Sequence, residues 1–144
     1  MEPKEKTEIT VQTTINAPVE TVWKCWTTPD DITKWNYASD DWHTTWAEND
    51  LRVGGKFLSR MEAKDGSEGF DFWGIYDKLI THELIECTMG DGRKLSIVFL
   101  PIGSTTQVIE TFDAEDLNSI ELQRYGWQCI LDNFKKHTET QTKQ

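Results

Sequence analysis

The feature that most restricts the fold is a series of short runs with alternating apolar residues, each separated from the next by a tight turn. The turns are rich in glycine and aspartate, as in Lys64-Asp65-Gly66-Ser67. Runs with a two-residue period predict β-strands, and turns this short join antiparallel neighbours. We therefore expect one antiparallel sheet built from residues 51–63, 69–79, 83–88, 95–100 and 105–112.

The segments before this series predict one more strand and two short helices. Residues 7–15 are rich in Thr, Val and Ile and predict a strand. Pro18 favours the first turn of a helix, and residues 28–35 predict a second short helix. Residues 36–49 show no clear period, so we expect a loop with a short strand near Trp46.

A single long helix is predicted at the end of the chain. Asn118 is the expected N-cap, Glu121 completes a capping-box pattern, and the helix continues to about Thr138. Its apolar residues fall along one stripe, which is typical of a helix that packs on one side.

These elements predict the α+β class. Only the last helix is long enough to cover the apolar face of the sheet. We expect a curved antiparallel sheet of about six or seven strands around this C-terminal helix, with the two short helices closing one end. One domain spans residues 1–144, and residues 1–6 and 139–144 are expected to be frayed.

Charge and cysteine content exclude several functions. Fifteen Lys and Arg against 25 Asp and Glu give a net charge of -10, which disfavours nucleic acid and anionic membrane surfaces as partners. We find no apolar run long enough for membrane insertion and no signal-peptide pattern. The three cysteines are scattered without metal-binding spacing, which indicates a reducing, cytoplasmic location and neither a disulfide framework nor a zinc ribbon.

The apolar residues that share one face of each strand either fill a core or line a pocket, because alternation alone does not separate the two. Seven Trp in 144 residues are a first indication of a ligand cavity. The candidate ligand-binding residues are Trp35, Trp42, Phe57, Met61, Phe70, Phe72, Tyr76, Phe99, Val108, Glu110, Phe112, Arg124, Trp127 and Leu131.

Two of these candidates are charged. Glu110 has the same parity as Val108 and Phe112, so its carboxyl group is expected to face inward, where it needs a partner or a raised pKa. Arg124 precedes Trp127 by one helical turn. It either orients an anionic or carbonyl group at the pocket mouth or pairs with Glu121 on the surface.

No catalytic set, metal site or cofactor is predicted. Asp41 and His43 offer acid–base groups, but no second histidine lies near them, and a structural role in a loop is the favoured interpretation. Gly54 and Gly55 do not fit a phosphate-binding loop. They predict a bulge or a close backbone approach within a strand.

Several segments resemble one family, the START-like (SRPBCC) superfamily, and within it the AHSA-like subgroup. That subgroup is similar to the C-terminal domain of the activator of the 90-kDa heat-shock protein ATPase. The segments that carry the resemblance are residues 34–43, 47–57, 60–67, 69–72, 121–124, 126–127 and 133–134, and the resemblance extends from about Thr7 to Lys136.

The resemblance implies a helix-grip fold with a cavity between the sheet and the last helix. It favours a protein that binds a small hydrophobic or amphipathic molecule. One alternative is a polyketide cyclase- or hydrolase-like enzyme that uses Glu110, His43 or Asp41 in that cavity. Another is a chaperone-interacting protein, although the activator's N-terminal domain, which carries much of the chaperone contact, has no counterpart in these 144 residues. Edge strands of such a sheet can pair, so a homodimer is possible.

Overall fold

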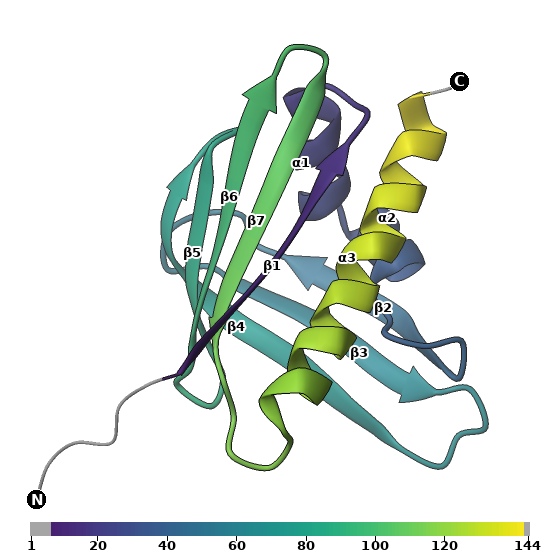
Figure 1. The fold of residues 1–144 in the computed structure, drawn as a ribbon. Helices are drawn as coiled ribbons and strands as arrows, with labels where there is room; N and C mark the ends of the chain where they lie inside the picture. The colour runs from purple at the N-terminus through teal and green to yellow at the C-terminus, as the bar shows by residue number, and fades with distance from the viewer. Residues whose placement is uncertain (1–6, 143–144) are drawn as a thin grey trace, which may run out of the picture.

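This computed structural model describes residues 7–142 of the chain. They contain seven strands and three helices, joined by turns and loops. One strand is followed by two short helices, six strands and a long helix (Figure 1). The elements are β1 (Glu8–Ile15), α1 (Val19–Thr27), α2 (Pro29–Trp35), β2 (Trp42–Asn49), β3 (Lys56–Ala63), β4 (Gly69–Ile80), β5 (Leu84–Met89), β6 (Lys94–Ile102), β7 (Thr105–Asp113) and α3 (Ile120–Thr142).

The strands form one antiparallel sheet in the order β1-β7-β6-β5-β4-β3-β2. Its pairing shifts register between Thr44 and Trp46 in β2 and between Tyr76 and Lys78 in β4. Irregularities of this kind increase the local twist. Figure 1 shows β3 and β4 running at a steep angle to β1 and β7, so that the sheet curves around α3. The predicted α+β helix-grip arrangement is confirmed.

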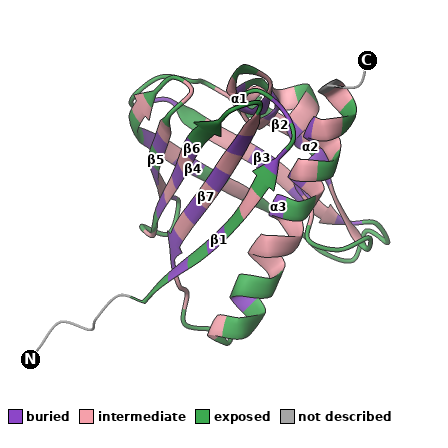
Figure 2. Ribbon diagram, turned by 45° about the horizontal axis from the view of Figure 1, so that its top comes forward, coloured by how far each residue is buried: buried purple, intermediate pink, exposed green. Residues whose placement is uncertain are grey.

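Side chains alternate between the two faces of each strand, as the period predicted. In β7 the buried residues Thr106, Val108, Glu110 and Phe112 alternate with partly exposed neighbours. Figure 2 shows buried positions alternating with exposed ones along β1 and with intermediate ones along β7. The buried face is the concave one, because it is the face that α3 and the two short helices cover.

Several predicted boundaries are wrong in the first half of the sheet. The short strand expected near Trp46 is present, but it is the eight-residue strand β2 and takes up more of residues 36–49 than predicted, because its irregular pairing hides the two-residue period. Gly54 and Gly55 precede β3 and lie in a turn. Gly54 has a φ of 84°. A Cβ atom on Gly55 would lie 2.1 Å from the Asp50 carbonyl oxygen, so the close backbone approach does exist there.

The long helix also differs from its predicted bounds. Its N-cap is Ser119, whose hydroxyl accepts a hydrogen bond from the backbone N–H of Leu122 at 3.1 Å. Asn118 and Glu121 therefore do not form the predicted capping box. The helix continues past its predicted end near Thr138 to Thr142, so residues 139–142, which were expected to be frayed, are helical in the structure. The predicted fraying of residues 1–6 and 143–144 lies outside the described residues.

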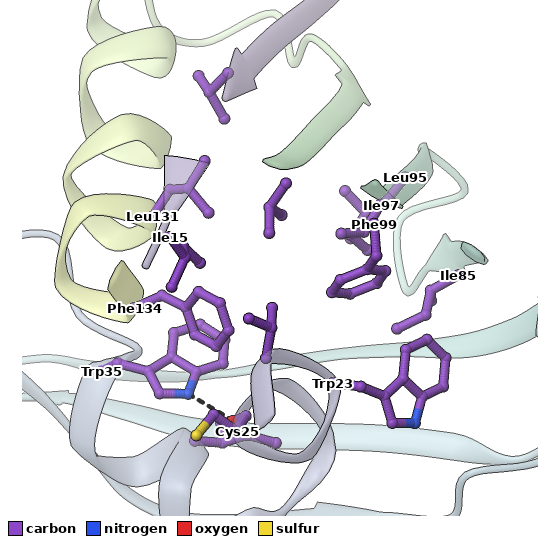
Figure 3. Close-up of a cluster of buried hydrophobic side chains, with 14 of the residues drawn as sticks. Ile15, Trp23, Cys25, Trp35, Ile85, Leu95, Ile97, Phe99, Leu131 and Phe134 are labelled. Carbon is purple, nitrogen blue, oxygen red and sulfur yellow. Dashed lines mark hydrogen bonds between the residues drawn. The ribbon is translucent and has the colours of Figure 1, made fainter. Parts of the chain in front are cut away.

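The helices pack on the concave face of the sheet and form the core with it. Figure 3 shows Leu131 and Phe134 of α3 beside Trp35 of α2, opposite Ile97 and Phe99 of the sheet. Within the described range, no helix combines the length and the apolar composition needed to cross a lipid bilayer.

Candidate functional site

A cavity of about 510 Å³ lies between the concave face of the sheet and the first half of α3. Its walls come from β2–β7, from α1, α2 and the loop after them, and from residues 122–130 of α3. On the strands and on α3, the wall positions with the smallest side chains are Ser59 of β3 and Gly126 of α3. A Cβ atom at Gly126 would meet nothing within 4 Å. The short side chains at these two positions help to leave the space open.

The structure places nine of the fourteen predicted ligand-binding residues in the cavity wall. These nine are Trp35, Trp42, Phe57, Met61, Phe70, Phe72, Tyr76, Glu110 and Trp127. Their role in binding stays a prediction, but their common location supports it.

The other five predicted residues lie away from the cavity. Phe99, Val108, Phe112 and Leu131 are at most 1% exposed and belong to the filled core. Arg124 lies on the exposed side of α3. It is one helical turn from Trp127, but Gln123, Gly126 and Trp127 border the cavity and Arg124 does not. Strand and helix periods indicate only the inward direction, and both core and cavity lie in that direction.

Aromatic rings form much of the wall. The ring of Phe57 lies 5.7 Å from Phe72 and 5.5 Å from Tyr76, measured between centroids. Trp127 from α3 meets Phe72 edge-on at 6.1 Å and stacks on Phe112 at 3.8 Å. Such rings are held by one another, so the apolar wall is shaped before any ligand arrives.

Some polar groups in the wall are already satisfied by the protein. The Tyr76 hydroxyl donates to Asn49 Oδ1 at 2.5 Å. The Gln123 side chain bonds the backbone at Glu115 and Asn118. Arg93 pairs with Asp91 and donates to the Asp113 carbonyl at 3.1 Å. These groups serve the fold and leave little bonding capacity for a ligand.

Three buried polar side chains in the wall have no hydrogen-bond partner among the described residues: Asn36, Ser59 and Glu110. Sequence reasoning found only Glu110. Ser59 has the same parity as Phe57 and Met61, so the signal for it was present. No local pattern marks Asn36, which faces the cavity because α2 ends there.

Glu110 is the most unusual of the three. It is 5% exposed, and its cross-strand neighbours are the apolar residues Val11 and Ile97. Burial raises the pKa of its carboxyl group to about 8. At neutral pH the group is therefore mainly a neutral acid, which can donate one hydrogen bond and accept others.

The acid–base candidates of the enzyme hypothesis do not meet in the cavity. Asp41 and His43 are absent from its wall, and His43 lies opposite Glu62 at the outer end of β2. Cys87 borders the cavity, but burial raises the pKa of its thiol to about 12, so it is not a nucleophile at neutral pH. Of the three residues that the hypothesis names, only Glu110 borders the cavity.

Comparison with known proteins gives a consistent result. The family model described as "Activator of Hsp90 ATPase homolog 1-like protein" matches residues 16–139. The solution structure of an AHSA1-like protein from Aeromonas hydrophila is similar at 43% identity, covers 96% of each chain and has a TM-score of 0.89. Protein Chr148 from Cytophaga hutchinsonii is 51% identical over 94% of each chain, with a TM-score of 0.81.

A more distant structure agrees in fold. A Chromobacterium violaceum protein with 23% identity has a TM-score of 0.83 over 92% of this chain and 98% of its own. Among curated proteins, none matches the sequence significantly.

Proposed function

We propose that this chain, which belongs to the Activator of Hsp90 ATPase homolog 1-like family, binds a small amphipathic molecule in the cavity between its sheet and α3. The observation that carries the proposal is an apolar cavity whose few free polar groups are buried and lack protein partners. Its volume of about 510 Å³ is within the range of small-molecule sites.

The wall indicates the chemistry of the ligand. The aromatic rings of Phe57, Phe72 and Trp127 favour an apolar, partly planar body. A buried polar group without a partner is unfavourable by roughly 1–3 kcal/mol. Asn36, Ser59 and Glu110 border the cavity without protein partners, so a ligand that bonds to them should carry hydrogen-bonding groups on its surface.

Glu110 favours a neutral ligand with an acceptor oxygen. A protonated carboxyl group donates well to a carbonyl or hydroxyl oxygen. Among the described residues of the wall, Arg93 is the only cation, and it already pairs with Asp91, so an anionic group placed beside Glu110 would gain no free positive partner. Aromatic polyketides and flavonoids combine an apolar ring system with carbonyl oxygens and fit this description better than fatty acids.

Native mass spectrometry of the purified protein, followed by a thermal-shift screen, tests the proposal. The screen contains flavonoids, aromatic polyketides and fatty acids. We expect a co-purified small molecule, or a dose-dependent rise in Tm with the carbonyl-bearing aromatic compounds. A protein that carries nothing and that no compound stabilises would contradict the proposal.

Gly126 provides a matched pair of variants for the same screen. Gly126→Leu places a large side chain on the wall of the cavity, whereas Gly126→Ala adds one methyl group in open space. Both replace a helical glycine and should stabilise α3 by up to about 1 kcal/mol. We expect ligand binding to be lost only in Gly126→Leu. Equal binding in both variants would place the ligand elsewhere.

The family description favours contact with an Hsp90-type ATPase as a second candidate function. Leu117, Leu122 and Tyr125 are exposed by 91%, 56% and 70% around the start of α3 and offer an apolar contact. If this candidate is correct, adding the protein should raise ATP hydrolysis by a purified Hsp90-type chaperone, and Leu122→Glu should lower that effect. Unchanged hydrolysis would exclude it.

A further inference from the structure

A second group of polar side chains lies outside the cavity, where the three helices meet. Cys25 of α1, Asp31 of α2 and His137 of α3 each offer one ligand atom, and these three atoms lie within 4.8 Å of one another. His137 Nε2 is 2.9 Å from Asp31 Oδ1. The Cys25 residue is 2% exposed, and the His137 and Asp31 side chains are 10% and 14% exposed. The group is thus buried but close to the surface.

A fourth polar group, the hydroxyl of Thr138, lies next to Cys25. Thr138 follows His137 in α3 and is fully buried. Its hydroxyl lies beside the Cys25 thiol but has no hydrogen-bond partner of good geometry. A buried, unpartnered hydroxyl is rare and calls for a cause, such as an ion that the hydroxyl or a water on it can reach.

The positions of the three residues are held by contacts other than those of their three ligand atoms. Trp35 Nε1 donates to the Cys25 carbonyl at 2.9 Å, which joins α2 to α1 (Figure 3). Trp35 also packs against Phe134 of α3, with ring centroids 4.9 Å apart. Asn133 Nδ2 donates to the Tyr37 carbonyl at 2.7 Å and joins α3 to the end of α2. The site is therefore formed by the fold before it binds anything.

The types of ligand indicate which ion would bind. A thiolate, an imidazole and a carboxylate are the three donor types that zinc accepts, usually in tetrahedral geometry. A thiolate and a carboxylate together neutralise a divalent cation, so the bound group would carry no net charge into the protein interior.

We propose that Cys25, Asp31 and His137 form a zinc site that joins the three helices, with a water molecule in the fourth position. Binding breaks the S–H bond of Cys25 and releases its proton to solvent, and His137 binds through a deprotonated ring nitrogen. The site lies apart from the proposed ligand cavity, because none of the three residues belongs to the cavity wall.

The same residues do not fit a nucleophilic Cys–His–Asp triad. Burial and the Asp31 carboxylate raise the pKa of the Cys25 thiol, whereas a nucleophilic cysteine needs a lowered one. His137 uses Nε2 toward Asp31, and a substrate would have no open approach to a sulfur on a residue that is 2% exposed.

Metal titration of the purified chain tests the proposal. The protein is treated with a chelator and then dialysed against Zn²⁺. The bound metal is quantified by inductively coupled plasma mass spectrometry. We expect one Zn²⁺ per chain and a rise in Tm that depends on the Zn²⁺ concentration. With Co²⁺ as a probe, we expect a sulfur-to-metal charge-transfer band and the intense visible bands of a tetrahedral site.

Variants identify the ligands. Cys25→Ser should remove the charge-transfer band, and His137→Gln should weaken binding by at least the ~10–100-fold seen when even an outer-shell partner is lost. Cys129→Ser is the matched control, because Cys129 lies on α3 outside both sites, and it should keep the wild-type spectrum.

The spectrum of the wild-type protein decides the question even if a variant fails to fold. No stoichiometric uptake would overturn the proposal. So would uptake with a weak octahedral Co²⁺ spectrum and no charge-transfer band, since that pattern indicates binding by surface carboxylates only.

Discussion

The space between the sheet and α3 has two ends, and they are occupied differently. At one end α1 and α2 insert large rings: Trp26 lies 4.8 Å from Phe134 and 5.0 Å from Trp35, and Trp23 lies 5.2 Å from Phe99. At the other end no helix is inserted, and Ser59 and Gly126 help to leave the cavity open. Trp26 and Trp35 belong to both ends, because the edge of the filled cluster is one wall of the cavity.

The difference shows what the two short helices do. They fill one end of the space between the sheet and the long helix and so confine the cavity to the other end. The tryptophans from residue 23 to residue 35 serve mainly this packing, although their abundance suggested a ligand site. Apolar content alone therefore does not separate a filled region from an open one.

The largest expected effect is at the filled end. Phe134→Ala removes a fully buried ring that contacts Trp26 and Trp35, and it should lower the free energy of unfolding by about 3–5 kcal/mol. Phe72→Ala is the matched change at the open end. It enlarges an existing space and should lower the free energy by only about 1–2 kcal/mol. Urea unfolding measures both, and equal losses would mean that the cavity is filled.

The next effect concerns the buried acid at the open end. The pKa of Glu110 is about 8 in the folded protein against 4.5 as the ordinary value. Between these values the unfolded chain binds fewer protons than the folded one, so stability falls as the pH rises. From pH 5 to pH 7 the free energy of unfolding should fall by about 2–3 kcal/mol through this group.

Glu110→Gln should remove that part of the pH dependence, because the amide does not titrate. Urea unfolding of both proteins at several pH values measures the difference, which should grow with pH up to about 8. Parallel curves would show that the carboxyl group is not buried as described.

A smaller contrast compares two tryptophans. Trp35→Phe leaves the buried Cys25 carbonyl without its donor and should lower the free energy of unfolding by about 1–3 kcal/mol. Trp127→Phe breaks no hydrogen bond among the described residues and should change it by less than about 1 kcal/mol. Thermal unfolding compares the two, and the reverse order would contradict the assignment of filled and open ends.

The smallest effect is expected at Arg124. Because its side chain lies outside the cavity wall, Arg124→Ala should change the free energy of unfolding by no more than about 0.5 kcal/mol. Titration with a compound identified by thermal shift should give an unchanged Kd. Weaker binding would show that Arg124 contacts the ligand, as its position near Trp127 in the sequence first suggested.

The sheet and its inward faces follow from local patterns. The turns predicted the hairpins, and parity placed Glu110 inward with Val108 and Phe112, as the structure shows. The strand predicted near Trp46 exists as β2, but its full length was missed because the register shift between Thr44 and Trp46 breaks the two-residue period. Boundaries set by single contacts, such as the Ser119 cap, were missed by one residue.

The sequence by itself thus determined the order of the elements and the direction of most side chains, because these depend on neighbours a few residues away. Only the tertiary structure decided which inward residues border empty space, separating Phe57 and Trp127 from Phe99 and Leu131. It also brought Cys25 and Asp31 to His137, more than 100 residues away. Both outcomes depend on how the curved sheet and the three helices pack against one another. That packing joins residues far apart in the chain, so the spacing of residues within one element does not predict it.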